Sequence, residues 1–224
     1  MFEAITLFSG YLAGSVPFGL VLCYLAGYGD IRKIGSGNIG ATNVLRTGNK
    51  PLAFLTLVLD SAKGAAVVLV LKYFFGWELA VVGAFGAVLG HLFPVWLLFK
   101  GGKGVATTFG TLLALSPLVG GVTSLIWLGV AALFRYSSLA ALVSLVSSPF
   151  LAYFLTADDL FAAYCSFIAV LIYVKHRDNI KRLFSGTESK IGEKKGTEKE
   201  AYGKTDVQKD TKTASEKQDQ AKRN

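Results

Sequence analysis

The sequence predicts an all-α integral membrane protein with about seven transmembrane helices, its N-terminus out and its C-terminus in, and with short re-entrant or interfacial helices. Three observations lead to this class. The 224 residues are 52% hydrophobic with a mean hydropathy of +0.48, and 17% of them are charged, whereas soluble proteins carry about 25%. Apolar runs long enough to cross a bilayer recur along the chain. Basic residues gather in alternate connections between those runs.

The candidate spans are seven apolar runs. A bilayer core of about 30 Å is crossed by roughly 20 helical residues. The runs are 4–28, 51–75, 78–99, 103–115, 117–134, 137–155 and 159–175. The first has no basic segment before it and is too long for a cleaved signal peptide, so we expect it to be retained. The fourth is too short to span alone, and Ser116-Pro117 follows it, so a short or re-entrant helix is expected there.

Charge sets the predicted orientation. Seven crossings leave four segments on one side of the membrane: 29–50, 100–103, 135–136 and everything after 175. The basic residues of that side, before the last forty residues, are Arg32, Lys33, Arg46, Lys50, Lys100, Lys103, Arg135, Lys175, Arg177, Lys181 and Arg182. The opposite side carries Glu3, Glu78, Asp158 and Asp159, with Lys72 near a helix end where it can snorkel. Because basic connections stay in the cytoplasm, the C-terminus is predicted to be cytoplasmic.

Composition divides the chain into two parts. Residues 1–185 are predicted to form a transmembrane domain, which carries 13 basic and 7 acidic residues. This positive excess suits an anionic partner, although cytoplasmic connections alone would also produce it. Residues 186–224 are rich in Lys, Glu, Thr, Asp and Gln, and they are predicted to be a disordered charged cytoplasmic tail because they cannot bury enough apolar surface. Cys23 and Cys165 stand alone in apolar runs, which predicts packing rather than a disulfide or metal cluster.

The first polar segment that suits an anion runs from Gly35 to Arg46. Its opening matches G-x-G-x-x-G, but a dinucleotide site needs a strand before it and a βαβ unit, and neither is predicted. Small residues let backbone N–H groups approach an anion, and Arg46 can contact phosphate with two hydrogen bonds. The residues proposed for binding are Gly35, Ser36, Gly37, Asn38, Gly40, Thr42, Asn43 and Arg46. The alternative is a glycine-rich loop followed by an interfacial helix with a snorkelling arginine.

The second segment is Lys100-Gly101-Gly102-Lys103-Gly104-Val105-Ala106-Thr107-Thr108. Glycines and a lysine again precede a helix, which predicts a second anion site. It is not a Walker A loop, because Lys103 is followed by Gly104 instead of Ser or Thr. The residues proposed for binding are Gly101, Gly102, Lys103, Gly104 and Thr107. The alternative is a glycine hinge with an interfacial lysine.

The third segment begins at His176 and continues Arg177-Asp178-Asn179-Ile180-Lys181-Arg182-Leu183. At helical spacing His176 and Asn179 share a face. The alternative is a helix end whose basic residues favour the helix dipole and anionic lipid. Each segment alone is ambiguous, but three of them on one membrane face predict a site for one or two phosphates.

Two polar features fall inside predicted spans. Asp60 and Lys63 lie one helical turn apart within 51–75. Charges inside a membrane are costly and indicate function by default, but mutual neutralisation as a structural pair is equally compatible. His91 could face a cavity, and a hydrogen-bonded packing histidine is the preferred interpretation.

Five stretches, taken together, are typical of one known family. They are Gly14-Ser15-Val16-Pro17-Phe18-Gly19, Gly35 through Asn43, Asp60 with Lys63-Gly64, Gly90-His91 through Thr107, and His176 through Ile180. Over residues 1–188 the chain resembles the bacterial acyl-phosphate-dependent glycerol-3-phosphate acyltransferases, the PlsY family. Gly186-Thr187-Glu188 also fits that family's ending, whereas the charged tail departs from its compact members.

The resemblance implies transfer of a fatty acyl group from acyl phosphate to the sn-1 hydroxyl of glycerol 3-phosphate, giving lysophosphatidic acid and phosphate, the first step of bacterial phospholipid synthesis. It makes residues 1–185 a transmembrane acyltransferase domain of the bacterial inner membrane, with its active site facing the cytoplasm. It implies no cofactor, no metal and no nucleic acid. The implied partners are the two substrates, membrane lipid and, transiently, the soluble acyltransferase that makes the acyl phosphate.

Under this resemblance we divide the polar residues by role. The catalytic set is Ser36, Asn43, Arg46, Lys103, His176 and Asn179. Ser36, Thr42 and Asn43 are assigned mainly to the acyl-phosphate group. The assignment to glycerol 3-phosphate, and to charge near the reacting carbonyl, covers Arg46, Lys103, His176 and Asn179. The proton of the attacking hydroxyl goes either to His176 or to an oxygen of the acyl phosphate. We favour the second route, because positive charge around His176 discourages it from accepting a proton.

Other function classes fit less well. The His-x4-Asp pair of other glycerolipid acyltransferases is missing, because Trp96 follows His91 by five residues and Lys181 follows His176 by five. Two distant histidines and no HExxH motif disfavour a zinc hydrolase. The main alternative is a membrane transporter for an organic phosphate, since broken helices that aim their N-termini at anions occur there. Against it, the basic segments gather on one face and no inverted repeat is visible.

Overall fold

The computed structural model describes residues 1–193, and every regular element in them is helical. The α-helices are α1 (Phe2–Gly14), α2 (Phe18–Leu25), α3 (Ala41–Val44), α4 (Lys50–Phe75), α5 (Trp77–Leu92), α6 (Val105–Leu115), α7 (Pro117–Phe134), α8 (Ser137–Thr156), α9 (Asp159–Lys175) and α10 (Arg177–Phe184). Three 3-10 turns lie between them, η1 (Ile31–Lys33), η2 (Leu45–Thr47) and η3 (Val95–Leu97). The all-α prediction is confirmed.

Each of the seven predicted spans corresponds to a helix or a broken helix, but their lengths differ. Among the described residues, five segments are long and apolar enough to cross a membrane: Phe2–Leu25, Lys50–Phe75, Trp77–Leu97, Pro117–Phe134 and Ser137–Thr156. A sixth results if α9 and α10, bent by 63°, count as one span. The remaining run is α6, whose 11 residues cover about half a bilayer. It is the short helix that the sequence predicts there.

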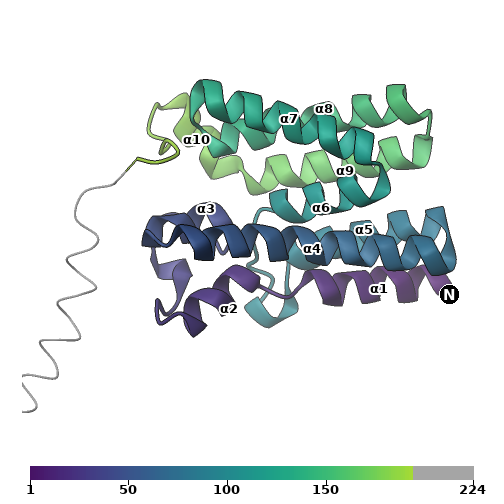
Figure 1. Ribbon diagram of the computed structural model, residues 1–224, viewed down its shortest axis with the longest axis horizontal. Helices are drawn as coiled ribbons and strands as arrows, with labels where there is room; N and C mark the ends of the chain where they lie inside the picture. Colours follow the sequence, from purple (N-terminus) through teal and green to yellow (C-terminus); the bar gives the residue numbers. More distant parts are fainter. Residues whose placement is uncertain (194–224) are drawn as a thin grey trace, which may run out of the picture. The chain divides into compact units, whose positions relative to one another are not determined.

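The helices of the compact unit lie nearly side by side in two groups (Figure 1). One group contains α1, α2, α4 and α5, and the other contains α7, α8 and α9, with α6 between them. The N-terminus lies at the end of the unit opposite to α10 (Figure 1). The short helices α3 and α10 therefore mark one common end of both groups.

Glycines let the first group pack closely. On α5, a side chain at Gly90 would lie 2.0 Å from the carbonyl oxygen of Tyr11 on α1. On α1, a side chain at Gly14 would lie 2.0 Å from the carbonyl oxygen of Ala87. Small residues permit such backbone contact between membrane helices, where no hydrophobic force from water drives association. Close backbone packing at these glycines thus fixes the position of α1 relative to α5.

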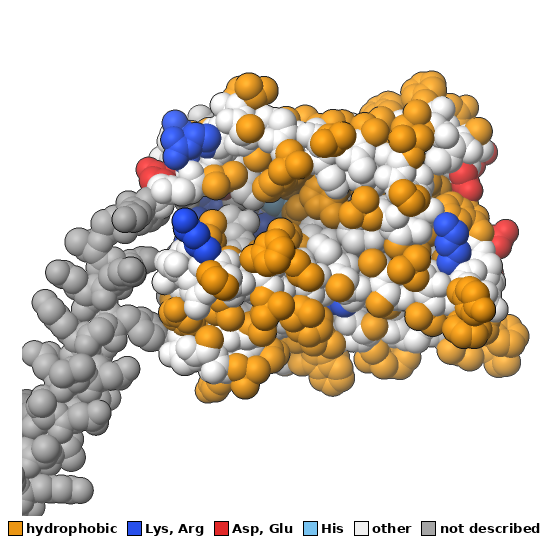
Figure 2. All heavy atoms as spheres, viewed as in Figure 1, with side chains coloured by type: hydrophobic (Ala, Val, Ile, Leu, Met, Phe, Trp, Pro, Cys, Tyr) orange, Lys and Arg blue, Asp and Glu red, His pale blue; other side chains and the backbone are white. Residues whose placement is uncertain are grey.

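Large apolar side chains cover the outside of the unit. Phe54 and Phe74 on α4, Leu133 on α7 and Phe154 on α8 are each more than 65% exposed. Hydrophobic atoms dominate the face shown in Figure 2, and basic and acidic side chains appear mainly near its two ends. A surface of this kind is unfavourable in water and suits contact with lipid.

The compact unit ends at Ile191, which is the sixth residue of the predicted tail. The Ile191 backbone N–H donates to the carbonyl oxygen of Arg135 at 2.6 Å, and the Arg135 side chain donates to the Ile191 carbonyl oxygen at 3.1 Å. Residues 186–191 therefore pack on the helical domain. Residues 194–224, which make up most of the predicted disordered tail, lie outside the described residues.

Candidate functional site

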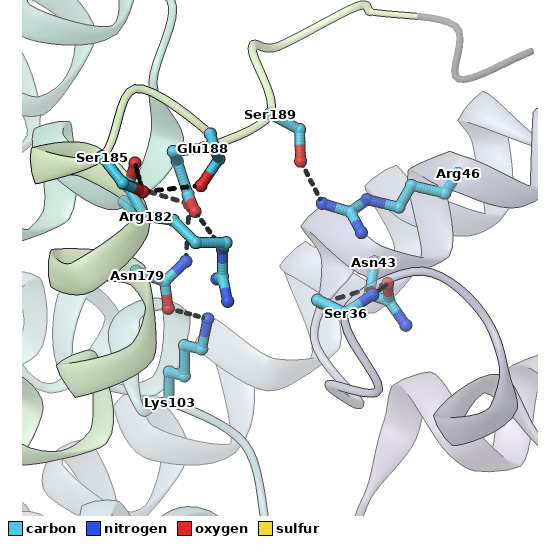
Figure 3. A network of polar contacts seen from close by, with 11 residues as sticks. Ser36, Asn43, Arg46, Lys103, Asn179, Arg182, Ser185, Glu188 and Ser189 are labelled. Atoms are coloured by element: carbon cyan, nitrogen blue, oxygen red, sulfur yellow. Dashed lines mark hydrogen bonds and ion pairs between the residues drawn. The ribbon is translucent and has the colours of Figure 1, made fainter.

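The three polar segments meet at the end of the unit marked by α3 and α10 (Figure 3). Lys103, before α6, donates a hydrogen bond to the side-chain oxygen of Asn179 on α10 at 2.5 Å. Thr42, on α3, lies 3.3 Å from the hydroxyl of Ser137 on α8. Figure 2 shows the surface hollowed between the helices at this end, with basic side chains visible in the hollow. The segments that the sequence analysis singled out thus border one place.

Asn43 organises the first segment from within. Its side chain is 1% exposed, and its amide nitrogen lies 2.8 to 3.0 Å from three backbone carbonyl oxygens, those of Ile31, Ile34 and Asn38. Its amide oxygen accepts from the backbone N–H and the hydroxyl of Ser36, at 3.0 and 3.1 Å. These contacts use the hydrogen-bonding groups of the amide inside the loop. Asn43 therefore holds the loop in this structure, and the Ser36 N–H is not free for an anion.

Glycine is required at the start of this loop. Gly35 has φ +57°, a left-handed conformation that other residues rarely adopt. A side chain there would lie 2.5 Å from Cδ of Arg46 and 2.7 Å from the amide oxygen of Asn43. Gly35 thus allows Arg46 to pass over the loop. Gly37 also has a left-handed φ of +70°, whereas Gly40 has an ordinary φ of −84° as the residue before α3.

The second segment packs against His91 of α5. The Gly102 N–H donates to the His91 carbonyl oxygen at 3.0 Å. A side chain at Gly102 would lie 2.1 Å from Nε2 of His91, and one at Gly101 would lie 2.2 Å from the His91 carbonyl oxygen. Gly104, with φ +81°, then begins α6. The glycines of this loop are needed for close contact with α5, which the anion-site hypothesis did not anticipate.

Thr107, which the sequence analysis proposes for substrate binding, faces the interior of the unit. It is fully buried on α6, and its backbone carbonyl oxygen would lie 2.6 Å from a side chain at Gly64 of α4. Its hydroxyl has no hydrogen-bond partner in the part of the chain that the structure describes. Thr107 lies in the first turn of α6, on the side that packs on α4.

Lys103 and Asn179 belong to a chain of polar contacts that ends on Glu188. Asn179 donates from its amide nitrogen to Glu188 at 2.6 Å, and Arg182 and Ser138 donate to the same carboxylate at 2.6 and 2.7 Å. Burial opposes the charge of Glu188, but these hydrogen bonds and the Arg182 guanidinium outweigh it and lower its pKa. The contacts are drawn in Figure 3. Glu188 therefore joins α8 and α10 as an anion.

Glu188 was missing from the predicted site. Its only sequence signal was the Gly186-Thr187-Glu188 ending shared with the resembling family, and it fell in the segment predicted as tail. Ser189, the residue after Glu188, also contacts the site: its hydroxyl accepts a hydrogen bond from Arg46 at 2.9 Å. Residues 188 and 189 thus link α10 to the loop that carries Arg46.

Burial shifts the pKa of Lys103. Desolvation is the largest cause and lowers its pKa, the attraction of Glu188 opposes this shift, and the repulsion of Arg182 and Arg46 adds to it, so that the pKa lies at about 8. The ammonium therefore remains mostly charged at neutral pH but loses its proton in the mildly alkaline range. Arg46, Lys103 and Arg182 place three positive charges around one partly buried carboxylate, and this excess of positive charge suits a phosphate ligand.

His176 is neutral in this setting. Burial, with the charge of Lys103 next in importance, lowers its pKa to about 4. Its Nδ1 lies 2.8 Å from the Ile172 carbonyl oxygen, and because a carbonyl only accepts, Nδ1 carries the hydrogen. In the neutral ring Nε2 then has a lone pair, and it makes no hydrogen bond within the described residues. His176 can accept a hydrogen bond through Nε2, but it is a weak base at pH 7.

A helical body with an apolar exterior and a partly buried basic cluster at one end defines an integral membrane protein with a site for phosphorylated ligands. The family model described as glycerol-3-phosphate acyltransferase matches residues 4–186. The chain belongs to that family of membrane acyltransferases.

Relatives and solved structures agree with this assignment. A glycerol-3-phosphate acyltransferase of Mesorhizobium japonicum is 58% identical over 185 residues, which cover 83% of this chain and 94% of the relative. One of Paramagnetospirillum magneticum is 58% identical over 192 residues, covering 85% and 94%. The crystal structure of PlsY (YgiH), an integral membrane glycerol 3-phosphate acyltransferase, in its glycerol 3-phosphate form matches with a TM-score of 0.81 at 38% identity, over 85% of this chain and 96% of that one. Its lysophosphatidic acid form matches with a TM-score of 0.79 at 36% identity, over 85% and 95%.

Proposed function

We propose that this protein transfers a fatty acyl group from acyl phosphate to the sn-1 hydroxyl of glycerol 3-phosphate, giving lysophosphatidic acid and phosphate. The observation that carries the proposal is the contact between Lys103 and Asn179 at the end of a lipid-facing helical body. It brings a partly buried cation from one segment to a polar helix from another, next to Arg182 and across from Arg46 (Figure 3). A substrate with a phosphate at one end and an acyl chain at the other fits such a place.

We assign glycerol 3-phosphate to the side of the site formed by Lys103, Asn179 and His176, with Arg46 reaching it from the first loop. Lys103 and Arg46 supply charge for the phosphate. The free Nε2 of His176 accepts a hydrogen bond from a hydroxyl of the glycerol, which orients it. We assign the acyl phosphate to the side of Ser36 and Thr42, with Asn43 holding that loop in shape.

The reaction balances without an added base. The sn-1 oxygen attacks the carbonyl carbon of acyl phosphate, the bond from that carbon to the phosphate oxygen breaks, and phosphate leaves. The hydroxyl proton passes to an oxygen of the departing phosphate. The acyl phosphate is already activated, so positioning and charge stabilisation by Lys103 and Arg46 supply most of the catalysis. A His176 pKa of about 4 supports this route, because an effective base has a pKa near the working pH.

We further propose a bacterial inner-membrane location with the α3 and α10 end facing the cytoplasm and the N-terminus outside. The basic connections of that end support this orientation through the positive-inside rule. The soluble acyltransferase that forms acyl phosphate is then able to deliver the donor at the same face. Membrane lipid surrounds the apolar exterior.

The test uses purified full-length protein in detergent with palmitoyl phosphate and glycerol 3-phosphate. Equal amounts of lysophosphatidic acid and inorganic phosphate are expected, and palmitoyl-CoA should not replace palmitoyl phosphate. Product formed only from palmitoyl-CoA would overturn the donor. Uptake of glycerol 3-phosphate into vesicles without any acylated product would instead support an organic-phosphate transporter.

A further inference from the structure

A cluster of three ionisable side chains is buried between α4 and α5. The Lys63 ammonium donates to the Asp60 carboxylate and to the Val16 carbonyl oxygen, both at 2.7 Å, and lies 2.9 Å from Nδ1 of His91. The three side chains are 3 to 5% exposed. Lys63 thereby joins α4 to α5 and to the break between α1 and α2.

The direction of these hydrogen bonds fixes the histidine ring. An ammonium has no lone pair and can only donate, so Nδ1 of His91 accepts from Lys63. In the neutral ring the hydrogen is then on Nε2. That atom faces the second polar segment, because it lies 2.1 Å from the position of a side chain at Gly102. Lys63 therefore determines both the ring orientation and the atom that His91 turns toward the loop.

The backbone of His91 contacts the same loop. Its carbonyl oxygen accepts from the Gly102 N–H at 3.0 Å and stands 2.2 Å from a side chain placed at Gly101. Gly102 directly precedes Lys103. The buried cluster is thus connected to Lys103 through the His91 ring and the Gly102–Lys103 peptide.

A contribution to folding stability does not by itself explain why this cluster is present. Charges inside a membrane are expensive, and an apolar replacement of a buried ion pair is often neutral or stabilising. We propose that Asp60, Lys63 and His91 are positioning residues for glycerol 3-phosphate, which hold the Gly101–Gly104 loop so that Lys103 reaches the phosphate. This inference rests on the proposed function. The three residues act through Lys103 and touch no substrate.

The first experiment compares His91→Leu with His91→Asn in the full-length protein. His91→Leu removes the acceptor for Lys63 and the ring edge under Gly102. It is expected to raise the KM for glycerol 3-phosphate roughly tenfold to a hundredfold, since small misplacements of binding groups have effects of this size. The KM for palmitoyl phosphate should stay within about twofold of the wild-type value, because Lys103 is assigned to the other substrate. His91→Asn restores part of the loss, because its amide oxygen can accept from Lys63.

The matched control is Thr123→Ala. Thr123 is a fully buried polar residue on α7, and its hydroxyl donates only to the Val119 carbonyl oxygen at 2.7 Å. Its removal should leave both KM values unchanged. Thermal unfolding in the same detergent is measured for all variants. A lower melting temperature and a smaller active fraction, with both KM values unchanged in His91→Leu, would mean that the cluster only supports the fold.

A double-mutant cycle with Lys103→Met tests whether His91 acts through Lys103. If His91 acts through Lys103, the double variant has nearly the same KM for glycerol 3-phosphate as Lys103→Met alone. Effects that multiply would overturn the proposal. Should His91→Leu fail to fold, the Asp60→Asn, Lys63→Met double variant removes both charges and must raise the same KM. A normal KM there also overturns it, whereas absence of product with the wild-type protein would refute the proposed function instead.

Discussion

The Lys103 ammonium donates a hydrogen bond to the side-chain oxygen of Asn179, a residue 76 positions later in the chain. Lys103 comes from the loop before α6, and Asn179 comes from α10 at the end of the other helix group. Asn179 in turn donates to Glu188 at 2.6 Å. The position of the cation therefore depends on contacts from both halves of the unit.

Lys103 gives the activity an alkaline limit. Its pKa of about 8 in the free protein means that the ammonium is charged below that pH and loses its charge above it. Phosphate monoesters are already dianions there, because their second pKa is about 6. We expect kcat/KM for glycerol 3-phosphate to fall above about pH 8, approaching tenfold per pH unit.

Lys103→Arg is the control for this pH dependence. Arginine keeps its charge up to about pH 12, so the alkaline fall should disappear in the variant even if its activity is lower. The measurement is the pH profile of kcat/KM between pH 6.5 and 10 in mixed buffers of constant ionic strength. An unchanged fall near pH 8 in Lys103→Arg would assign it to another group.

Truncation tests the C-terminal boundary of the domain. A chain ending at Ser185 lacks the Glu188 carboxylate that binds Asn179 and Arg182, and both partners would then lose a charge-assisted hydrogen bond, each contributing about 1–3 kcal/mol. We expect loss of activity and a lower melting temperature. A chain ending at Glu193 keeps these contacts and should retain activity. Full activity of the shorter chain would show that residues 186–191 are dispensable.

The sequence alone was sufficient for the helical membrane class and for the meeting of the three polar segments. Apolar runs report span positions directly, because lipid tolerates few charges. The short α6 was also predictable, since a Ser-Pro pair ends a 13-residue run. The apolar runs and the Ser-Pro pair are local features of the sequence, and they can be recognised without knowing the fold.

The individual side-chain partners within and between these segments could not be predicted. Thr107 was expected to touch substrate because it follows the glycine loop, but its place against Gly64 depends on how α6 packs on α4. Asn43 was proposed as a binding and catalytic residue, and nothing in the sequence indicated that three carbonyl oxygens from residues 31–38 surround its amide. Glu188 sits in a polar, charged segment that resembles disorder by composition. Only the tertiary structure supplies its partners.

The role of Asn43 can be isolated by an isosteric change. Asn43→Asp removes the donor nitrogen that faces the Ile31, Ile34 and Asn38 carbonyl oxygens, and it adds a negative charge among them. Buried acceptors that lose their donor cost about 1–3 kcal/mol, so the loop should loosen and activity should fall at least about tenfold. Limited proteolysis and the KM for palmitoyl phosphate measure the two effects.

Asn49→Asp is the matched control, because it makes the same chemical change at the residue that caps α4. The Asn49 side-chain oxygen accepts from the Leu52 N–H at 3.0 Å, and aspartate caps a helix as well as asparagine does. Little change in activity or protease resistance is expected. Equal damage in both variants would mean that any added charge at this end of the unit is harmful.

Glycine packing between α1 and α5 makes a further prediction about stability. Gly90→Ala would place Cβ 2.0 Å from the Tyr11 carbonyl oxygen, so α1 and α5 must move apart. Overpacking of this kind costs about 1–3 kcal/mol, and a lower melting temperature is expected. Gly129→Ala on α7 meets nothing within 4 Å and should be neutral or slightly stabilising. Equal melting temperatures for the two variants would contradict the close packing of α1 on α5.

Substitution of His176 distinguishes a role in substrate binding from a role in proton transfer. With a pKa of about 4 it is neutral at pH 7 and accepts protons poorly, so His176→Ala is expected to raise the KM for glycerol 3-phosphate while turnover at saturating substrate falls by less than about tenfold. Loss of a general base typically costs 10²–10⁴-fold in turnover. Steady-state kinetics with both substrates varied distinguish the two cases. If turnover collapses while the KM stays constant, His176 is the proton acceptor, and the transfer to the departing phosphate is wrong.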